Sequence, residues 1–368
     1  MIEPTYALSW PRELFEWAAS RILDSEREFP KAKIALLLEE AFDDDDVAGQ
    51  FLRMGTGSFG WDFEVPPTAS SAQDWFVELL KDESRLQPFR RPLYWAQRYD
   101  TDLDGGTDIS TGFAGDFLDL INKLSETGYI PKVLPKWCPD ADNPSDEWVS
   151  QQISTAIRIR TVWPELIRDP DTASDALLFS LVEYFHDQAQ RPSTFTVHDY
   201  AGCGRHYEGY DAVAGRAIYR WRVNQLLRDH NISLQLAANG EEQGRLIREF
   251  SAPLQELVTE QLEARQQPQD EIAHAIRDFR SRGASLVAKR AAVTLIANNL
   301  EARRKTLKAL VSDDENDLFN IANNFAIRHR NPSQKTDYGD QFLDWIFWNF
   351  LAATELLDAL ERRGSGLQ

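Results

Sequence analysis

The residues best suited to chemistry lie between positions 323 and 334, in the sequence NNFAIRHRNPSQ. Arg328 continues an apolar stripe at helical spacing that begins at Leu318, and His329 lies beside that stripe. A guanidinium group can hold the charge of a phosphate, and an imidazole can move protons near neutral pH. These residue types at this spacing are therefore suited to phosphate chemistry.

Two interpretations of this segment are open. In one, Arg328, His329 and Arg330 satisfy the last carbonyl groups of a helix that Pro332 ends. In the other, Arg328 and His329 are catalytic, because an arginine at the inner end of an apolar stripe needs a partner. The polar residues that would then bind the substrate are Asn323, Asn324, Arg330, Asn331 and Lys335.

A second candidate is the stretch DTDLDGGTD, residues 100–108. The carboxylates of Asp100, Asp102 and Asp104, followed by Gly105, reproduce the first half of a calcium-binding loop. The twelfth position is Thr111, where such a loop has a bidentate glutamate. A solvated turn is the favoured interpretation.

A third candidate is the group His198, Cys203 and His206, which lies within nine residues and could supply three metal ligands. No fourth ligand is evident nearby. The chain has two cysteines, and Cys138 is far from Cys203, so neither a disulfide framework nor a CxxC motif is predicted. The favoured interpretation is that residues 191–211 form a long loop with tyrosines packed beneath it. The sequence thus predicts no bound metal and no cofactor. The aspartates of residues 100–104 and the group His198, Cys203 and His206 are weak candidates for metal ligands.

The charge of the chain is unevenly distributed. The net charge is −19, which argues against a polyanionic partner for the protein as a whole. Residues 270–368, however, contain 14 Lys and Arg against 14 Asp and Glu, and a basic run between Arg277 and Lys308 precedes an acidic one. The neutral C-terminal part could meet an anion, whereas the acidic remainder would repel it.

The elements that must position these residues are mainly helices. We expect a mainly α fold with three parts: an acidic, mostly helical domain over 1–140, a small α+β domain over 145–243, and a helical bundle over 244–368. Residues 139–147 are predicted to be a linker. Two alternating runs around Asn239-Gly240 predict a β-hairpin. Four helices with short connections, the second starting near Ser285 and continuing past Leu307, predict the bundle.

The segment LFNIANNFAIRHRNPSQ, at the end of the third bundle helix and before a long aromatic helix, resembles the HEPN superfamily. FLDLINKLSETGYIPKV is similar to the N-terminal regions of AbiJ-like abortive-infection proteins of bacteria. The resemblance implies a HEPN-like four-helix bundle, an effector or regulator of phage defence, and metal-independent RNA cleavage by Arg328 and His329. The family's second histidine is replaced here, since Ser333, Gln334 and Lys335 occupy its place.

The resemblance also implies a composite site formed by two bundles. The last helix supports a homodimer independently, because aromatic residues such as Phe342 and Trp345 surround it instead of lining one face. The alternative class is a non-catalytic module that binds RNA or protein, with a regulator or phage component at the N-terminal region. No apolar run reaches the length of a membrane span and no secretory signal is evident, so we expect a cytoplasmic protein without a membrane partner.

Overall fold

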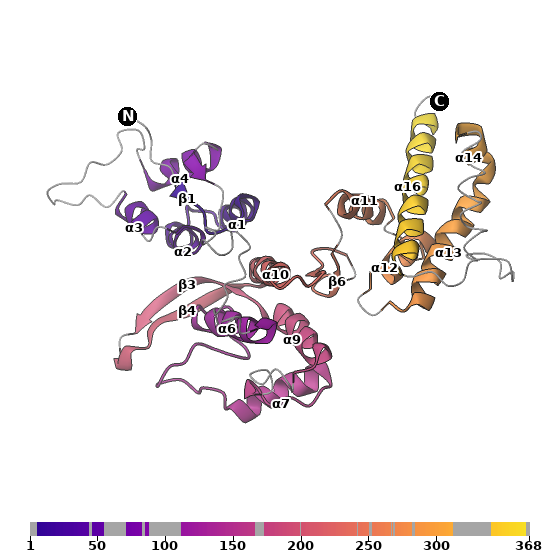
Figure 1. Cartoon of the computed structure of the whole chain (residues 1–368). Coiled ribbons are helices and arrows are strands. Elements are labelled where there is room, and N and C mark those ends of the chain that lie inside the picture. Colours follow the sequence, from indigo (N-terminus) through magenta and orange to yellow (C-terminus); the bar gives the residue numbers. More distant parts are fainter. Residues whose placement is uncertain are drawn as a thin grey trace, which may run out of the picture. The chain divides into compact units, whose positions relative to one another are not determined.

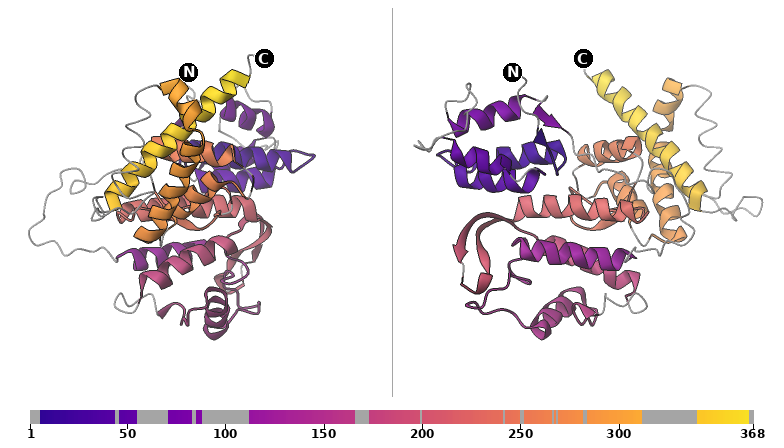
Figure 2. Two further views of the ribbon diagram at one scale, coloured as in Figure 1. Left: turned by 90° about the vertical axis from the view of Figure 1, so that its right-hand side faces the viewer. Right: turned by 60° about the vertical axis from the view of Figure 1, so that its left-hand side comes forward.

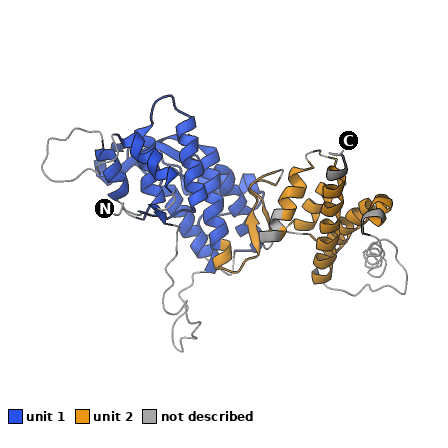
Figure 3. Cartoon of the chain, turned by 90° about the horizontal axis from the view of Figure 1, so that it is seen from above, with its two compact units in different colours: residues 1–226 blue, residues 227–368 orange. Residues whose placement is uncertain are grey.

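The computed structural model confirms that the chain is mainly helical, with small two-stranded sheets. It describes residues 6–43, 46–54, 71–82, 85–87, 112–165, 173–198, 200–240, 242–249, 252–265, 267, 269–281, 284–311 and 340–365. The chain divides into two compact units, residues 1–226 and residues 227–368, which Figure 3 shows in different colours. Each unit is described below by itself.

The first unit begins with a group of short helices around an aromatic core. Strands β1 (Tyr6–Ala7) and β2 (Leu86–Gln87) pair in parallel beside helices α1 (Arg12–Asp24), α2 (Lys31–Ala41), α3 (Asp46–Arg53) and α4 (Ala72–Lys81). Helix α1 begins directly after Pro11, whose fixed φ suits a helix start. Edge-on ring contacts such as Phe15 with Phe42 at 5.3 Å fill the interior.

Three further helices and a hairpin also belong to the first unit. The helices are α6 (Gly112–Glu126), α7 (Asp146–Ile157) and α9 (Asp175–Gln188). Ser145 and Ser174 begin α7 and α9 by accepting hydrogen bonds from Trp148 N and Leu177 N. Phe185 of α9 lies 5.0 Å from the Trp163 ring and packs into a second aromatic core.

The interpretation of residues 191–211 as a loop is wrong, because this segment forms the longest sheet in the described part of the chain. Strands β3 (Arg191–His198) and β4 (Gly204–Asp211) pair antiparallel and are joined by a 3₁₀ turn, Tyr200–Gly202. Figures 1 and 2 show the pair as a long twisted ribbon. Both of its faces are largely half-exposed, so its residues lack the strict apolar alternation that identifies a strand.

Ion pairs with α2 hold this hairpin on the helical group. The buried Arg191 of β3 donates from Nε to Glu40 at 3.0 Å, and Tyr129 donates its hydroxyl to the same carboxylate at 2.6 Å. Arg205 of β4 donates to Glu39 at 2.7 Å. Burial and the neighbouring Glu40 raise the pKa of Tyr129 well above its usual value, so its hydroxyl keeps the proton. Two adjacent glutamates of one helix therefore fix both strands.

Helix α10 (Ala212–Asp229) follows the hairpin directly and carries the chain into the second unit. Asp211 caps its start by accepting from Val213 N and Ala214 N, and it also bonds Arg21 of α1. Gly215 lies against the backbone of Gln190 and Arg191, where a Cβ atom would overlap. The absence of a side chain at Gly215 thus permits α10 to pack on the start of β3.

The second unit contains the predicted β-hairpin and a set of helices. Strands β5 (Leu234–Leu236) and β6 (Leu246–Arg248) pair antiparallel on either side of Asn239-Gly240, which confirms the hairpin. The helices are α11 (Ala252–Glu263), α12 (Glu271–Arg280), α13 (Leu286–Ala302), α14 (Arg304–Val311) and α16 (Asp340–Ser365). Ser285 begins α13 as predicted, but the predicted long helix is interrupted at Arg303, and α14 begins at the next residue.

The core of the second unit lies among α12, α13 and α16. The rings of Phe279 and Phe347 stack with centroids 3.8 Å apart. Lys289 of α13 is 2% exposed and donates to Asp344 of α16 at 3.1 Å. Its ammonium group also lies 5.2 Å from the centre of the Phe279 ring.

Several basic residues that the sequence made available to an anion are engaged inside this unit. Lys289 is buried with Asp344, Arg280 is 5% exposed beside Glu242, and Arg303 pairs with Asp358 at 2.7 Å. These charges are therefore neutralised by carboxylates of the same unit. The charge count over residues 270–368 overstates the basic surface that an anion could meet.

The contact-based division differs from the predicted domains, since the first unit combines the regions 1–140 and most of 145–243. Glu40 with Arg191, and Cys138 with Cys203, link the two regions across the predicted boundary. The predicted linker at 139–147 contains hydrogen-bonded turns, and helix α7 begins within it at Asp146. Among the described residues, no helix is both long and apolar enough for a bilayer crossing.

Candidate metal centre

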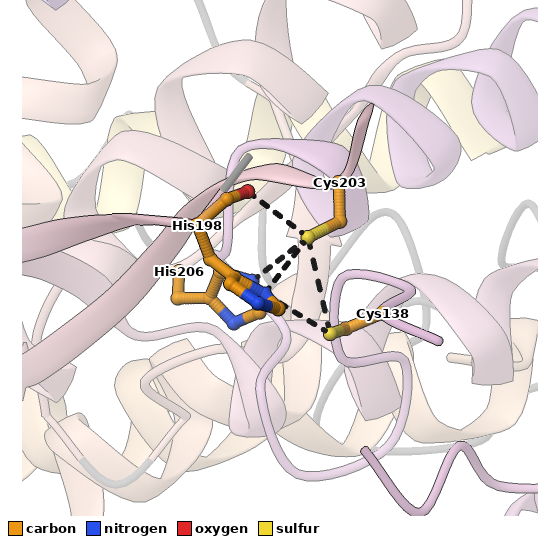
Figure 4. Close-up of side chains that lie close together, drawn as sticks. All are labelled: Cys138, His198, Cys203 and His206. Atoms are coloured by element: carbon orange, nitrogen blue, oxygen red, sulfur yellow. Dashed lines mark hydrogen bonds between the residues drawn. The ribbon is translucent and has the colours of Figure 1, made fainter. Parts of the chain in front are cut away.

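Four side chains that can ligate a metal converge in the first unit: Cys138, His198, Cys203 and His206 (Figure 4). One ligand atom from each lies within 4.8 Å of all the others. The Cys203 Sγ atom is 3.2 Å from His198 Nδ1 and 3.2 Å from His206 Nε2. The Cys138 Sγ atom is 4.0 Å from Cys203 Sγ and 4.0 Å from His198 Nδ1.

The register of the hairpin places three of these side chains. His198 is the last residue of β3 and pairs with Gly204, while His206 pairs with Thr196. Because side chains two residues apart share a face of a strand, His198 and His206 are diagonal neighbours on one face. Their ring centres are 5.1 Å apart.

The turn between the strands places Cys203 between the two histidines. Ala201, Gly202 and Gly204 all have positive φ, between 50° and 72°, which tightens the connection. Glycine adopts this conformation without the steric penalty that a Cβ atom brings. Cys203 follows this turn and its Sγ atom lies 3.1 Å from the His198 carbonyl oxygen.

Cys138 comes from a separate turn that Asn143 holds in shape. The Cys138 amide donates to Asn143 Oδ1 at 3.1 Å, and Asn143 Nδ2 donates to the Cys138 carbonyl at 2.6 Å. Asn143 Nδ2 also donates to the Ala141 carbonyl at 3.0 Å. The thiol of Cys138 is thereby directed inward, and the residue is 3% exposed.

Asp140 supports both halves of the group. Its backbone amide donates to Cys138 Sγ at 3.4 Å, and its carboxylate lies 3.3 Å from His198 Nε2. A carboxylate on the outer ring nitrogen leaves Nδ1 free to bind a metal and increases its basicity. An amide that donates to sulfur stabilises the thiolate form, which is the form that binds metal.

The donor set fits zinc. In a tetrahedral zinc site with Zn–S near 2.3 Å and Zn–N near 2.0 Å, the ligand atoms are about 3.3 to 3.8 Å apart. The observed separations, from 3.2 Å to at most 4.8 Å, surround these values. Two thiolates and two imidazoles with four protein ligands make a closed site of the structural kind, with no position left for a substrate.

The two thiols lie close together, with their Sγ atoms 4.0 Å apart. Burial, together with a hydrogen bond from the Cys138 thiol, raises the pKa of Cys203 above its usual value. A bound divalent cation reverses this effect, because it deprotonates a coordinating thiol. Metal binding at this group would therefore release protons.

The sequence identified three of the four residues and missed Cys138. The spacing rules for zinc motifs look for nearby pairs, and Cys138 precedes His198 by 60 residues. The sequence did contain a usable signal, because both cysteines lie next to turn-forming residues. Pro139 follows Cys138, and Gly202 and Gly204 flank Cys203. Cys138 is thus the fourth candidate ligand, which the sequence alone did not reveal.

The other candidate residues lie outside the described part of the chain. These are the calcium-loop residues Asp100, Asp102 and Asp104, and the C-terminal residues Asn323, Asn324, Arg328, His329, Arg330, Asn331 and Lys335. The functional interpretations of these two segments stay predictions.

Comparison of the chain with protein-family models, with curated proteins and with solved structures finds no match.

Proposed function

We propose that the first unit is a zinc-binding unit in which Cys138, His198, Cys203 and His206 hold one Zn²⁺. The observation that carries this proposal is the convergence of four ligand atoms, all within 4.8 Å of one another, from a hairpin and a distant turn. Buried cysteines with histidines on a shared face form the donor set that zinc prefers. Reducing conditions in the cytoplasm, where we place the protein, keep both thiols available.

The zinc has a structural role in this proposal. The hairpin end near the site has little apolar surface to bury, since Val197 and Tyr200 are 69% and 65% exposed. A metal that links this end to the Cys138 turn supplies stability that the core does not. It would also keep the two cysteines reduced and separate.

Metal analysis of the purified full chain tests the proposal. We expect about one zinc per chain after gel filtration, and near zero for Cys203→Ser and for His206→Gln. His274→Gln is the matched control, because His274 is an exposed histidine of the second unit. The proposal is wrong if the wild-type chain takes up no zinc from micromolar solution and its melting temperature does not rise when zinc is added.

For the chain as a whole we propose a HEPN-like effector or regulator of bacterial phage defence that acts on RNA in the cytoplasm. The support is the sequence around Arg328 and His329, together with the aromatic surface of α16, where Phe342 and Trp345 are 50% and 47% exposed. Arg328 would hold the scissile phosphate and His329 would move the proton of the 2′-hydroxyl. Large exposed aromatic residues on one helix suit contact with a second copy of the chain.

The residues around this pair would complete the RNA site in a homodimer. They are Asn323, Asn324, Arg330, Asn331 and Lys335. Zinc in the first unit takes no part in the cleavage, so the two proposals are independent. The alternative is a non-catalytic module that binds RNA or protein, with a regulator or phage component at the first unit.

RNA cleavage by the zinc-loaded chain separates these alternatives. We expect cleavage of total RNA that Arg328→Ala and His329→Ala abolish, while Lys308→Ala, an exposed lysine on α14, cleaves normally. No cleavage with or without a chelator, and cellular toxicity unchanged in both variants, would eliminate the nuclease. RNA binding that persists without cleavage would favour the non-catalytic module.

A further inference from the structure

A pocket adjoins the metal centre and shares one residue with it. One wall comes from the segment before Cys138 and includes Lys136 and Trp137. The other wall comes from β4 and includes Arg205, His206, Tyr207 and Tyr210. His206 is also a ligand of the proposed zinc site, so the pocket and the metal centre are contiguous.

The walls of this pocket are aromatic and open to solvent. Trp137 is 61% exposed and Tyr210 is 41% exposed. The Tyr207 ring packs closely on Gly128, where a Cβ atom would lie 2.5 Å from it, and Tyr210 donates its hydroxyl to the Tyr207 carbonyl at 2.8 Å. Exposed rings on a fixed support are suited to stacking on a planar ligand.

Lys136 provides the charge of the pocket. Its ammonium nitrogen lies 5.7 Å from the centre of the Tyr207 ring. No carboxylate of the described residues forms an ion pair with Lys136, whereas Arg205 is bonded to Glu39 at 2.7 Å. Lys136 is therefore the cation that remains to meet an anionic group.

We propose that this pocket binds a nucleotide, with the base stacked on Trp137 and Tyr210 and the phosphate at Lys136. The combination of exposed rings and an adjacent cation recognises a planar base that carries an anion, and neither part alone does so. The same chemistry occurs in a free mononucleotide and in a nucleotide of single-stranded RNA.

The metal centre fixes the spacing of the pocket walls. Cys138 follows Trp137 directly in the chain, and His206 lies between Arg205 and Tyr207 on β4. A metal ion bound to Cys138 and His206 therefore ties one wall to the other, and this part of the inference rests on the proposed zinc site. Loss of the metal would separate the two walls and weaken nucleotide binding.

Calorimetric titration of the zinc-loaded full chain tests the inference. The ligands are AMP, adenosine, inorganic phosphate and a six-nucleotide oligoadenylate RNA. We expect AMP to bind more tightly than adenosine or phosphate, and Lys136→Ala and Trp137→Ala each to weaken binding about tenfold or more. The matched controls are Lys132→Ala, an exposed lysine of the same segment, and Trp148→Ala, an exposed tryptophan of α7.

Each outcome has a defined meaning when the zinc content of every sample is measured. Equally weak binding of AMP, adenosine and phosphate at millimolar concentration, or AMP binding unchanged in both pocket variants, overturns the nucleotide site. Tighter binding of the RNA than of AMP identifies RNA as the source of the nucleotide, and the reverse identifies a free mononucleotide. If the chain takes up no zinc but still binds AMP, the nucleotide site stands and the proposed zinc site is wrong. The failure of one proposal can therefore be distinguished from the failure of the other.

Discussion

The Sγ atoms of Cys138 and Cys203 lie 4.0 Å apart although the two residues are 65 positions apart in the chain. Both residues are buried and both are free thiols. Since they are the two cysteines of the whole sequence, their chemistry can be followed without interference from other thiols.

The first prediction uses this pair. We expect iodoacetamide to modify neither cysteine in the zinc-loaded chain and both after treatment with a chelator. A metal-bound thiolate is a poor nucleophile, and removal of the metal should loosen this end of the hairpin, where Val197 and Tyr200 are 69% and 65% exposed. Intact mass spectrometry counts the modifications directly. Rapid modification of both thiols at full zinc occupancy would show that the zinc is bound elsewhere.

Asp140 is predicted to set the affinity of the site. Because its carboxylate lies 3.3 Å from His198 Nε2, Asp140→Asn should weaken zinc binding about 10- to 100-fold and leave one site per chain. A competition titration with a zinc-sensitive dye measures this change. Asp142→Asn, an exposed aspartate in the same turn, is the control and should bind zinc as the wild type does.

Gly215 is predicted to be intolerant of any side chain. Gly215→Ala would push a Cβ atom into the backbone of Gln190 and Arg191, so we expect a loss of about 1 to 3 kcal/mol in the free energy of unfolding. Urea denaturation gives this value. Gly49→Ala is the matched control, since its Cβ atom would make ordinary contact at 3.4 Å within helix α3 and should not destabilise.

Unchanged stability of Gly215→Ala would mean that α10 does not pack directly against the start of β3. The packing described above would then be wrong at this point.

His186 should make stability fall in mild acid. It is 2% exposed, its Nδ1 lies 3.2 Å from Asp187, and Arg220 lies 3.3 Å from Nε2, so the neutral ring fits this environment. Burial lowers the pKa of His186 to about 4, from 6.5 in the unfolded chain. Below pH 6.5 the unfolded chain therefore binds a proton that the folded chain does not, and stability is lost as the pH falls toward 4.

The size of this effect is about 2 kcal/mol between pH 7.5 and pH 5. Urea denaturation at both values of pH, compared between the wild type and His186→Gln, isolates the contribution because the metal centre is the same in both. The amide side chain of the variant does not titrate in this range, so this part of the pH dependence should disappear. An equal loss of stability in both proteins would contradict the low pKa of His186.

Much of the helical fold could be predicted from local signals. Ser285 begins a helix where the sequence places it, and Asn239-Gly240 lies within a hairpin, as predicted. These signals act over a few residues, so a single sequence contains them. The break at Arg303 was missed because no glycine or proline marks it.

The metal centre could be predicted only in part. His198, Cys203 and His206 belong to one hairpin and are close in the sequence, whereas Cys138 reaches them through tertiary packing. The hairpin itself was hidden, because partly exposed strands need no apolar alternation. Knowledge of the pairing between Arg191 and Asp211 would have been required to find it.

The distance along the chain between Cys138 and His206 has a consequence for synthesis. The last ligand follows the first by 68 residues, so a ribosome that adds about 5 to 20 residues per second completes the donor set roughly 3 to 14 s after Cys138 is made. Helices α7 and α9 are both translated within that interval. At the proposed zinc site, metal binding would therefore come after both helices have been synthesised.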